Sequence, residues 1–385
     1  MTKLIQAIDQ RFHWRWLSAV ASWTIEKAIT IQQIPAPTFA EHERATYVMN
    51  QFHAMKLDSV FMDDQFNVFG RLPGISSEPA LMIVAHTDTV FPAETDLSIR
   101  RVNNLVYGPG LGDNSLGVAG LLTIIDVLQK QQIRLPCDVW FVATSREEGL
   151  GDLGGMRAAF DYLKSRIKAV INLEGLSFGY VYHAGICVRR LRITVEADGG
   201  HSWANYGNPS AIHTLMQFGA QITHLTPPNT PRTTFNIGII KGGHSINSIA
   251  TQAELWLDLR SEDSAALISL EQQIHQLIRS MHTPETRFSV DVVGDRPGGS
   301  ISVNHPLVSL ARDALAQVGE IAVLETGSTD GNIALSAGCP TVTVGLTRGA
   351  NAHRLDEYIE TQPVAAGIRQ LILLTLAAAE TRFEA

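Results

Sequence analysis

The feature of this sequence that most constrains its fold is a series of short apolar runs followed directly or closely by acidic residues or histidine. Three such runs are Leu81–Ala85, Val139–Ala143 and Ala169–Leu173. Runs of this length indicate strands that are buried on both faces. Apolar residues at helical spacing lie between and before them, as in Leu116–Leu128 and at Ala45, Val48 and Phe52. Strands that alternate with helices predict an α/β fold with a mostly parallel sheet.

The pattern changes in the middle of the chain. The expected order there is strand Val188–Ala197, helix Pro209–Leu225, strand Thr233–Ile240, strand Ile249–Arg260, helix Ala265–Met281 and strand Arg287–Val293. This βαββαβ order is that of a ferredoxin-like unit. Because 385 residues exceed the usual size of a single core, we predict two domains. Residues 1–185 and 298–385 form the first, and residues 186–297 are inserted into it.

Composition and charge exclude several classes of protein. The net charge is −8 and no run of Lys or Arg occurs, which argues against a nucleic-acid partner. The most apolar segment, Val364–Ala379, is too short for a membrane span and contains Arg369. The first twenty residues contain charges where an export signal needs an apolar stretch. Three cysteines without CxxC spacing suit buried thiols in a reducing compartment. We therefore expect a cytoplasmic protein with no membrane partner.

Acidic residues and histidines gather where the predicted strands end. They are His86, Asp88, Asp113, Glu147, Glu148, Glu174 and His353. An open α/β sheet binds its ligand at the carboxyl ends of its strands. Any one of these residues alone is commonly a turn or capping residue. So many charged groups at the ends of buried strands would destabilise the folded protein unless they are solvated, paired or bound to metal.

The order of these motifs resembles that of the M20 metallopeptidase family, which includes glutamate carboxypeptidase, aminoacylase and succinyl-diaminopimelate desuccinylase. The similar elements are His-x-Asp-x-Val at His86–Val90, a glycine-flanked Asp113, the pair Glu147-Glu148 before Gly149, and a late His353. The chain departs from many relatives at Asn114–Leu116. The resemblance implies a zinc-exopeptidase-like catalytic domain with an inserted dimerisation and lid domain, and hence a homodimer.

The resemblance also implies a role for each site residue. His86 and Glu174 would bind one zinc ion, Glu148 and His353 a second, and Asp113 would bridge the two. Imidazole and carboxylate groups suit zinc, and Co²⁺ or Mn²⁺ would substitute. Two ions about 3.5–4 Å apart can share one hydroxide and polarise a carbonyl.

Two further carboxylates of the same region would act without binding metal. Asp88 would accept the other imidazole N–H of His86. Glu147 would be the general base toward water and then the acid toward the leaving amine. The resemblance further implies that the peptide bond between Asp113 and Asn114 is cis.

The inserted domain contributes its own candidates. Gly199–Ser202 resembles the family's lid motif, in which His201 would reach the partner subunit's site and stabilise an oxyanion. Asn247 and Arg260 match positions that hold the substrate carboxylate, although a surface salt bridge is the other interpretation of Arg260. The implied function is a di-zinc hydrolase that cleaves a peptide or N-acyl amide bond in a small carboxylate-bearing substrate. Glu174, rather than Asp, favours the deacylase and glutamate carboxypeptidase branch.

Two other interpretations remain open at this point. Gly175–Gly179 is a G-x-S-x-G element after a strand, so Ser177, Asp330 and His353 could form a serine-hydrolase triad. That interpretation leaves the other acidic residues without a role. A non-catalytic dimeric binding protein with the same fold is the second, and it would be expected to have lost Glu147 or a metal ligand.

Overall fold

The computed structural model describes residues 1–383, apart from the side chain of Glu78, and separates into two compact units. Unit 1 comprises Met1–Gly185 together with the chain from Gly299 onward, and unit 2 comprises Ile186–Gly298. The chain leaves unit 1 at the end of β8 (Tyr180–Gly185) and returns to it at β15 (Gly299–Ser300). These two strands pair in antiparallel fashion, with Gly185 opposite Gly299.

Unit 1 is built on a nine-stranded sheet in the order β1-β2-β6-β3-β7-β17-β8-β15, with β16 also paired to β8. The other strands are β1 (Asp58–Met62), β2 (Val68–Leu72), β3 (Ser76–His86), β6 (Cys137–Thr144), β7 (Ile167–Glu174), β16 (Val323–Gly327) and β17 (Thr341–Gly345). The four central strands, β6, β3, β7 and β17, are mutually parallel. This confirms the predicted α/β class and its mostly parallel sheet.

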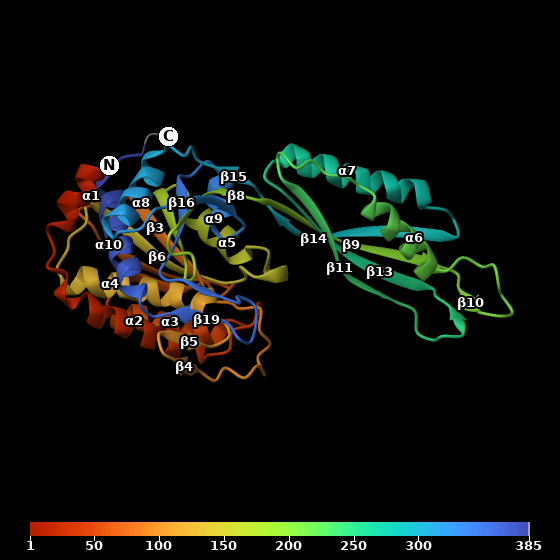
Figure 1. Cartoon of the computed structure of the whole chain (residues 1–385), viewed down its shortest axis with the longest axis horizontal. Helices are drawn as coiled ribbons and strands as arrows, with labels where there is room; N and C mark the ends of the chain where they lie inside the picture. Colours follow the sequence, from red (N-terminus) through yellow and green to blue (C-terminus); the bar gives the residue numbers. More distant parts are fainter. Residues whose placement is uncertain (384–385) are drawn as a thin grey trace. The chain divides into compact units, whose positions relative to one another are not determined.

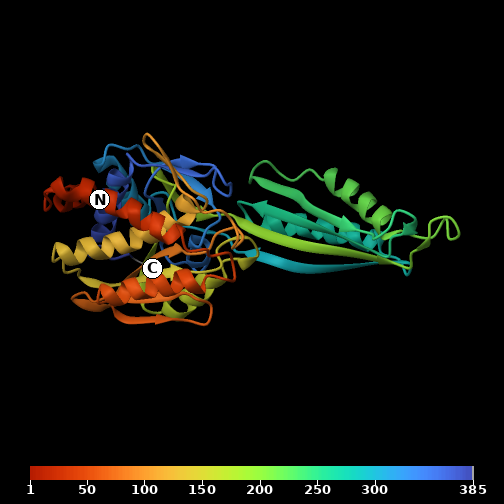
Figure 2. The same cartoon turned by 90° about the horizontal axis from the view of Figure 1, so that it is seen from below.

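Helices cover both faces of this sheet (Figures 1 and 2). They are α1 (Thr2–Asp9), α2 (Leu17–Gln32), α3 (His42–Ala54), α4 (Leu116–Lys130), α5 (Gly154–Leu163), α8 (Pro306–Gln317), α9 (Gly331–Ser336) and α10 (Val364–Glu380). Side chains of β3 alternate between two cores: Ile83 packs with α4 and α10, and Met82 packs with α5 and α9. Burial on both faces explains why this strand is apolar throughout.

Helix α4 illustrates how burial shapes composition. The segment Leu111–Lys130 has the length and hydropathy of a membrane span, but 89% of its most apolar window is buried inside the protein. That is the pattern of a core helix. A four-stranded sheet, in the order β18-β19-β5-β4, lies in the same unit. Its strands are β4 (Arg100–Val102), β5 (Leu105–Tyr107), β18 (Gly349–Ala350) and β19 (Tyr358–Glu360).

Unit 2 has the predicted ferredoxin-like topology. Its elements are β9 (Cys187–Ala197), α6 (Ala211–Thr223), β11 (Thr233–Gly242), β13 (Gln252–Ser261), α7 (Ser264–Met281) and β14 (Thr286–Arg296). The sheet order is β11-β13-β9-β14, with every neighbouring pair antiparallel. Apolar side chains of the strands, among them Leu191 and Leu257, pack against α6 and α7 in a separate core.

Some local expectations differ from the structure. The strand predicted from Ile249 is broken: β12 (Ser248–Ile249) pairs with β10 (Gly200–His201), and β13 begins only at Gln252. The thiols of Cys137 and Cys187 are buried as expected, but Cys339 is only partly buried.

Candidate metal centre

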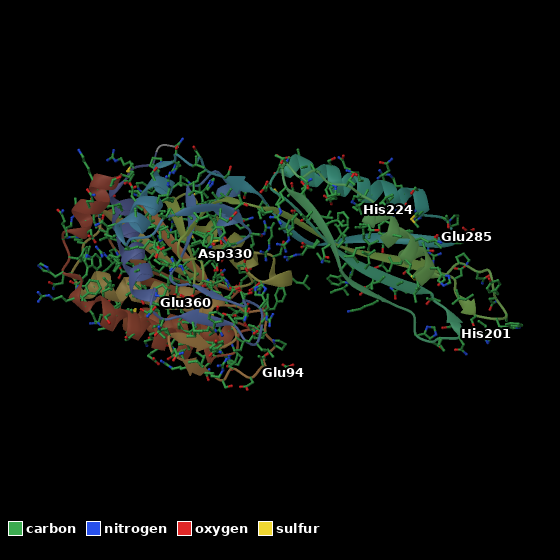
Figure 3. The ribbon with its side chains drawn as sticks, viewed as in Figure 1. Glu94, His201, His224, Glu285, Asp330 and Glu360 are labelled. Carbon is green, nitrogen blue, oxygen red and sulfur yellow. The ribbon has the colours of Figure 1, made fainter. Side chains whose placement is uncertain are left out.

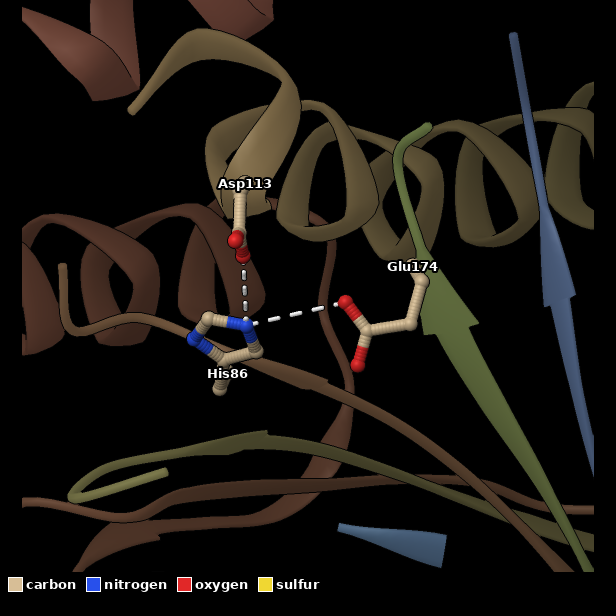
Figure 4. Close-up of side chains that lie close together, drawn as sticks. All are labelled: His86, Asp113 and Glu174. Atoms are coloured by element: carbon tan, nitrogen blue, oxygen red, sulfur yellow. Dashed lines mark ion pairs between the residues drawn. The ribbon is translucent and has the colours of Figure 1, made fainter. Parts of the chain in front are cut away.

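Two neighbouring parallel strands deliver the first metal-ligand candidates. His86 is the last residue of β3 and Glu174 the last residue of β7. Asp113 joins them from η2 (Leu111–Ser115), the irregular turn before α4. The Nε2 atom of His86 lies 3.1 Å from Oδ1 of Asp113 and 3.7 Å from Oε2 of Glu174 (Figure 4). Three donor atoms from separate elements therefore point at one position.

A second set of candidates lies against the other oxygen of Asp113. His353, in the loop between β18 and β19, places Nε2 3.0 Å from Oδ2 of Asp113 and 3.0 Å from Oε1 of Glu148. Asp113 therefore offers one oxygen to each set, which is the arrangement needed to bridge two ions. A third group of donor atoms within 4.8 Å of one another is His86, Glu147 and Glu148.

The charges of this cluster compensate one another in the metal-free protein. Hydrogen bonds that its ring donates to Asp113 and Glu148 raise the pKa of His353 to about 10. Burial alone would lower the pKa of His86, but its bonds to Asp113, Asp88 and Glu174 raise it well above the ordinary value. Burial raises the pKa of Glu174. Protons thus occupy positions where a divalent cation bound by imidazole and carboxylate groups would fit.

Asp88 holds the Glu147-Glu148 segment through the backbone. Its Oδ1 accepts the N–H of Glu147 and its Oδ2 the N–H of Glu148, each at 2.9 Å. Oδ2 also accepts the hydroxyl of Thr38. The Nδ1 atom of His86 lies 3.1 Å from the backbone oxygen of Asp88 and 3.5 Å from its carboxylate. Asp88 is fully buried, so these contacts position both the imidazole and the two glutamates.

Glu357 is a functional candidate that the sequence reasoning missed. Its buried carboxylate accepts three backbone N–H groups of the glycine-rich loop, from Gly110 (3.0 Å), Gly112 (2.6 Å) and Asp113 (3.0 Å). Burial and the nearby charge of Asp113 raise its pKa to about 7. The only signal in the sequence was the glycine-rich loop before Asp113, because its backbone N–H groups need a hydrogen-bond acceptor.

Asn114 ties the Asp113 turn to the end of β7. Its side chain donates to the backbone oxygen of Leu173 (2.7 Å) and accepts the N–H of Gly175 (2.9 Å). Gly175 has no room for a side chain, since an added Cβ would overlap the carbonyl oxygen of the loop residue Gly112. This close approach places Asp113 beside Glu174. The Asp113–Asn114 peptide bond is cis, as predicted.

The candidates of unit 2 are exposed. His201 is the last residue of the short strand β10 (Figure 3). Its Nδ1 faces the backbone N–H groups of Trp203 (3.2 Å) and Ala204 (3.3 Å). Because Nδ1 accepts these bonds, the neutral ring carries its proton on Nε2. The backbone oxygen of Asn247 accepts the N–H of Ser202, the residue after His201, at 3.1 Å.

Arg260 is engaged in a salt bridge. Its Nε donates to Oδ2 of Asp258 at 2.7 Å, and Arg190 donates to the other oxygen at 3.1 Å. Two guanidinium groups therefore share one carboxylate on this sheet. The surface salt bridge expected as the alternative is present.

The three residues of the alternative serine triad have other partners. Asp330 accepts the hydroxyl of Thr144, and His353 contacts Asp113 and Glu148. Burial raises the pKa of Tyr182, and a side-chain hydrogen bond with Ser177 partly opposes that rise. The described contacts thus do not assemble a nucleophile and base from this set.

Known proteins resemble this chain in sequence and in fold. The family model described as peptidase family M20/M25/M40 matches residues 82–377. Acetylornithine deacetylase from Edwardsiella ictaluri (strain 93-146) is 28% identical over 315 residues, which span 76% of this chain and 79% of that protein. A tripeptidase structure from Staphylococcus aureus matches with a TM-score of 0.79 at 20% identity, covering 94% of this chain and 99% of the other. A dinuclear metal-binding peptidase of Bacillus subtilis matches with a TM-score of 0.69 at 16% identity, with coverage of 94% and 99%.

Proposed function

Because the chain belongs to peptidase family M20/M25/M40 and is therefore a hydrolase of the peptidase and deacylase class, we propose that it is a di-zinc enzyme. Its substrate is a small carboxylate-bearing molecule in which it hydrolyses a peptide or N-acyl amide bond. The observation that carries this proposal is the position of Asp113, which offers one carboxylate oxygen to the His86 side of the cluster and the other to the His353 side.

These contacts support the ligand assignment. His86 and Glu174 would hold the first ion, His353 and Glu148 the second, and Asp113 would bridge them. Ions bound there would polarise the scissile carbonyl and lower the pKa of a water molecule. Cobalt or manganese would substitute for zinc, since nitrogen and oxygen ligands discriminate poorly among these ions.

Glu147 takes the proton from the attacking water and passes it to the leaving nitrogen. Glu148 is hydrogen-bonded to His353, which supports its assignment as the metal ligand of the pair. Asp88 acts as a positioning residue, because its carboxylate binds both backbone N–H groups of the pair. Proton transfer needs the base within hydrogen-bond reach of its target. The two hydrogen bonds to Asp88 fix the position of the Glu147 backbone.

Unit 2 serves as a dimerisation and lid domain in this proposal, and unit 1 as the catalytic domain. The chain forms a homodimer through unit 2, and His201 acts in the site of the partner subunit. The bonds accepted by Nδ1 of His201 support this role, because they leave Nε2–H to donate to an oxyanion. Asn247 and Arg260 hold the substrate carboxylate. Three free cysteines support a cytoplasmic location.

A substrate panel with controlled metal content tests the proposal. Metal-free protein would be loaded with zinc, cobalt or manganese and assayed on N-acyl amino acids, dipeptides and tripeptides. We expect hydrolysis of at least one amide class that disappears on chelation and returns with metal. The proposal fails if the loaded protein cleaves no amide of the panel, or if a serine-directed reagent inhibits it while a chelator does not.

A further inference from the structure

Phe39 and Arg146 share an unusual backbone conformation at the edge of the candidate metal centre. Both have left-handed φ values, +75° and +54°, although neither is glycine. A single oxygen of the fully buried Glu41 accepts the backbone N–H of each, at 3.0 Å in both cases. Left-handed conformations of non-glycine residues persist where the surroundings enforce them, and they cluster at functional sites. Glu41 thus joins two segments 105 positions apart so that these residues lie together.

The side chains of this pair form a cation–π contact. The guanidinium carbon of Arg146 lies 5.4 Å from the centre of the Phe39 ring, within the range of a favourable interaction. Phe39 is 53% exposed. Within residues 1–383, no carboxylate is paired with the Arg146 guanidinium, and its Nε has no hydrogen-bond partner. The aromatic ring therefore holds a positive charge that no internal anion neutralises.

The pair stands directly beside the catalytic machinery. Phe39 follows Thr38, whose hydroxyl donates to Asp88, and Arg146 precedes Glu147, whose backbone N–H donates to the same carboxylate. Both residues are thus one position away from groups that Asp88 holds.

We propose that Phe39 and Arg146 form a carboxylate-binding subsite of unit 1, in which Arg146 pairs with a substrate carboxylate and Phe39 holds the guanidinium in place. The inference rests on the proposed amide hydrolysis and assigns acid recognition to a residue outside unit 2. The planar guanidinium can bind a carboxylate through two parallel hydrogen bonds. The preferred substrates are therefore amides with an anionic group near the scissile bond.

Three matched pairs of substrates locate that carboxylate. They are N-acetylleucine with its amide, N-acetylglutamate with N-acetylglutamine, and N-succinylalanine with N-succinamoylalanine. We expect the wild-type enzyme to prefer the acid in at least one pair. Arg146→Gln should raise KM for that acid about 10- to 100-fold, the value of a charge-assisted hydrogen bond, while kcat and the neutral partner stay unchanged. Phe39→Ala should have the same effect, but smaller.

Arg348→Gln is the matched control, because Arg348 also stacks on a phenylalanine but is already paired with Glu320 at 2.6 Å. It should keep the acid preference. An acid preference of undiminished size in Arg146→Gln for all three pairs, or a KM change that is equal for acid and neutral partner, overturns the subsite.

A binding measurement separates this inference from the proposed hydrolysis. Glutarate and its monoamide glutaramate would be titrated into the metal-loaded protein, since each has one carboxylate for the metal and they differ only in the second group. Wild type should bind glutarate more tightly, and Arg146→Gln should lose most of this difference, whereas Arg348→Gln should keep it. If the panel shows no hydrolysis, this difference still supports the subsite, and equal binding by wild type refutes it.

Discussion

Glu357 accepts the backbone N–H of Asp113 at 3.0 Å across 244 positions of sequence. The segment that supplies one candidate ligand, His353, therefore also fixes the loop that supplies the bridging one. Both carboxylate oxygens of Glu357 accept backbone N–H groups of this loop. The position of Asp113 therefore depends on both oxygens being hydrogen-bond acceptors.

Glu357→Gln should weaken metal binding about 10- to 100-fold, the usual cost of losing a group that orients a ligand. The amide nitrogen of Gln cannot accept the N–H that one carboxylate oxygen now binds. Competition with a chelating dye measures the affinity. Asp356→Asn is the control, since the exposed Asp356 bonds to Arg354. Unchanged affinity in Glu357→Gln would show that the loop holds Asp113 without it.

Glu147→Gln should keep about two ions per subunit and lose roughly 10²- to 10⁴-fold in kcat, the contribution of a general acid–base group. Glu148→Gln should instead lose one ion, because Glu148 contacts His353. Elemental analysis beside steady-state kinetics distinguishes the two. The reverse pattern would exchange the roles assigned within the pair.

Metal binding should release protons. In the metal-free protein the pKa of His353 is about 10, raised by Asp113 and Glu148, so the ring is protonated at pH 7 and must lose its proton to bind an ion. Apparent affinity should therefore rise with pH up to about 10. Calorimetry in two buffers of different ionisation enthalpy counts the protons, and His353→Gln should release fewer. An equal count in wild type and variant would contradict the assignment.

The same raised pKa predicts how the metal-free protein responds to alkali. The folded pKa lies above the ordinary value of about 6.5, so the native state binds more protons than the unfolded state between these values. The stabilisation is complete below about pH 6.5 and is lost as pH rises through 10. Thermal unfolding of chelated protein from pH 6 to pH 10 should show a falling Tm, and a flatter profile for His353→Gln.

Mixing two inactive variants tests whether His201 acts in the partner's site. His201→Ala and Glu147→Ala would be combined under conditions of subunit exchange, in which about half of the dimers become mixed. If His201 crosses over, one site of each mixed dimer is intact, and activity should approach about a quarter of wild type. A tagged pull-down verifies exchange. Absence of recovery in verified mixed dimers would place His201 in its own subunit's chemistry.

The sequence predicted the sheet and the cluster of acidic residues because both leave local patterns. Buried strands such as β3 are apolar throughout, and parallel strands end at one edge, so His86 and Glu174 were expected to lie near each other. The salt bridge of Arg260 could also be predicted from the sequence, because Asp258 lies two positions earlier and so on the same face of the strand.

Contacts between distant backbone and side-chain groups left no such pattern. Glu357 and Glu41 bind N–H groups of segments more than 100 positions away, and nothing in the neighbouring residues marks them as acceptors. The left-handed conformation of Phe39 could not be predicted from the sequence either, because the residues that usually adopt it are glycine and asparagine.

The pairing of Gly185 with Gly299 has a consequence for how such a chain can change. Because the polypeptide leaves and re-enters unit 1 at adjacent backbone positions, the length of the segment between them does not set the register of this sheet. Joining β8 to β15 with a hairpin turn of about two residues would keep that register. Insertions and substitutions in unit 2 can therefore change specificity while the ligand-bearing strands stay as they are.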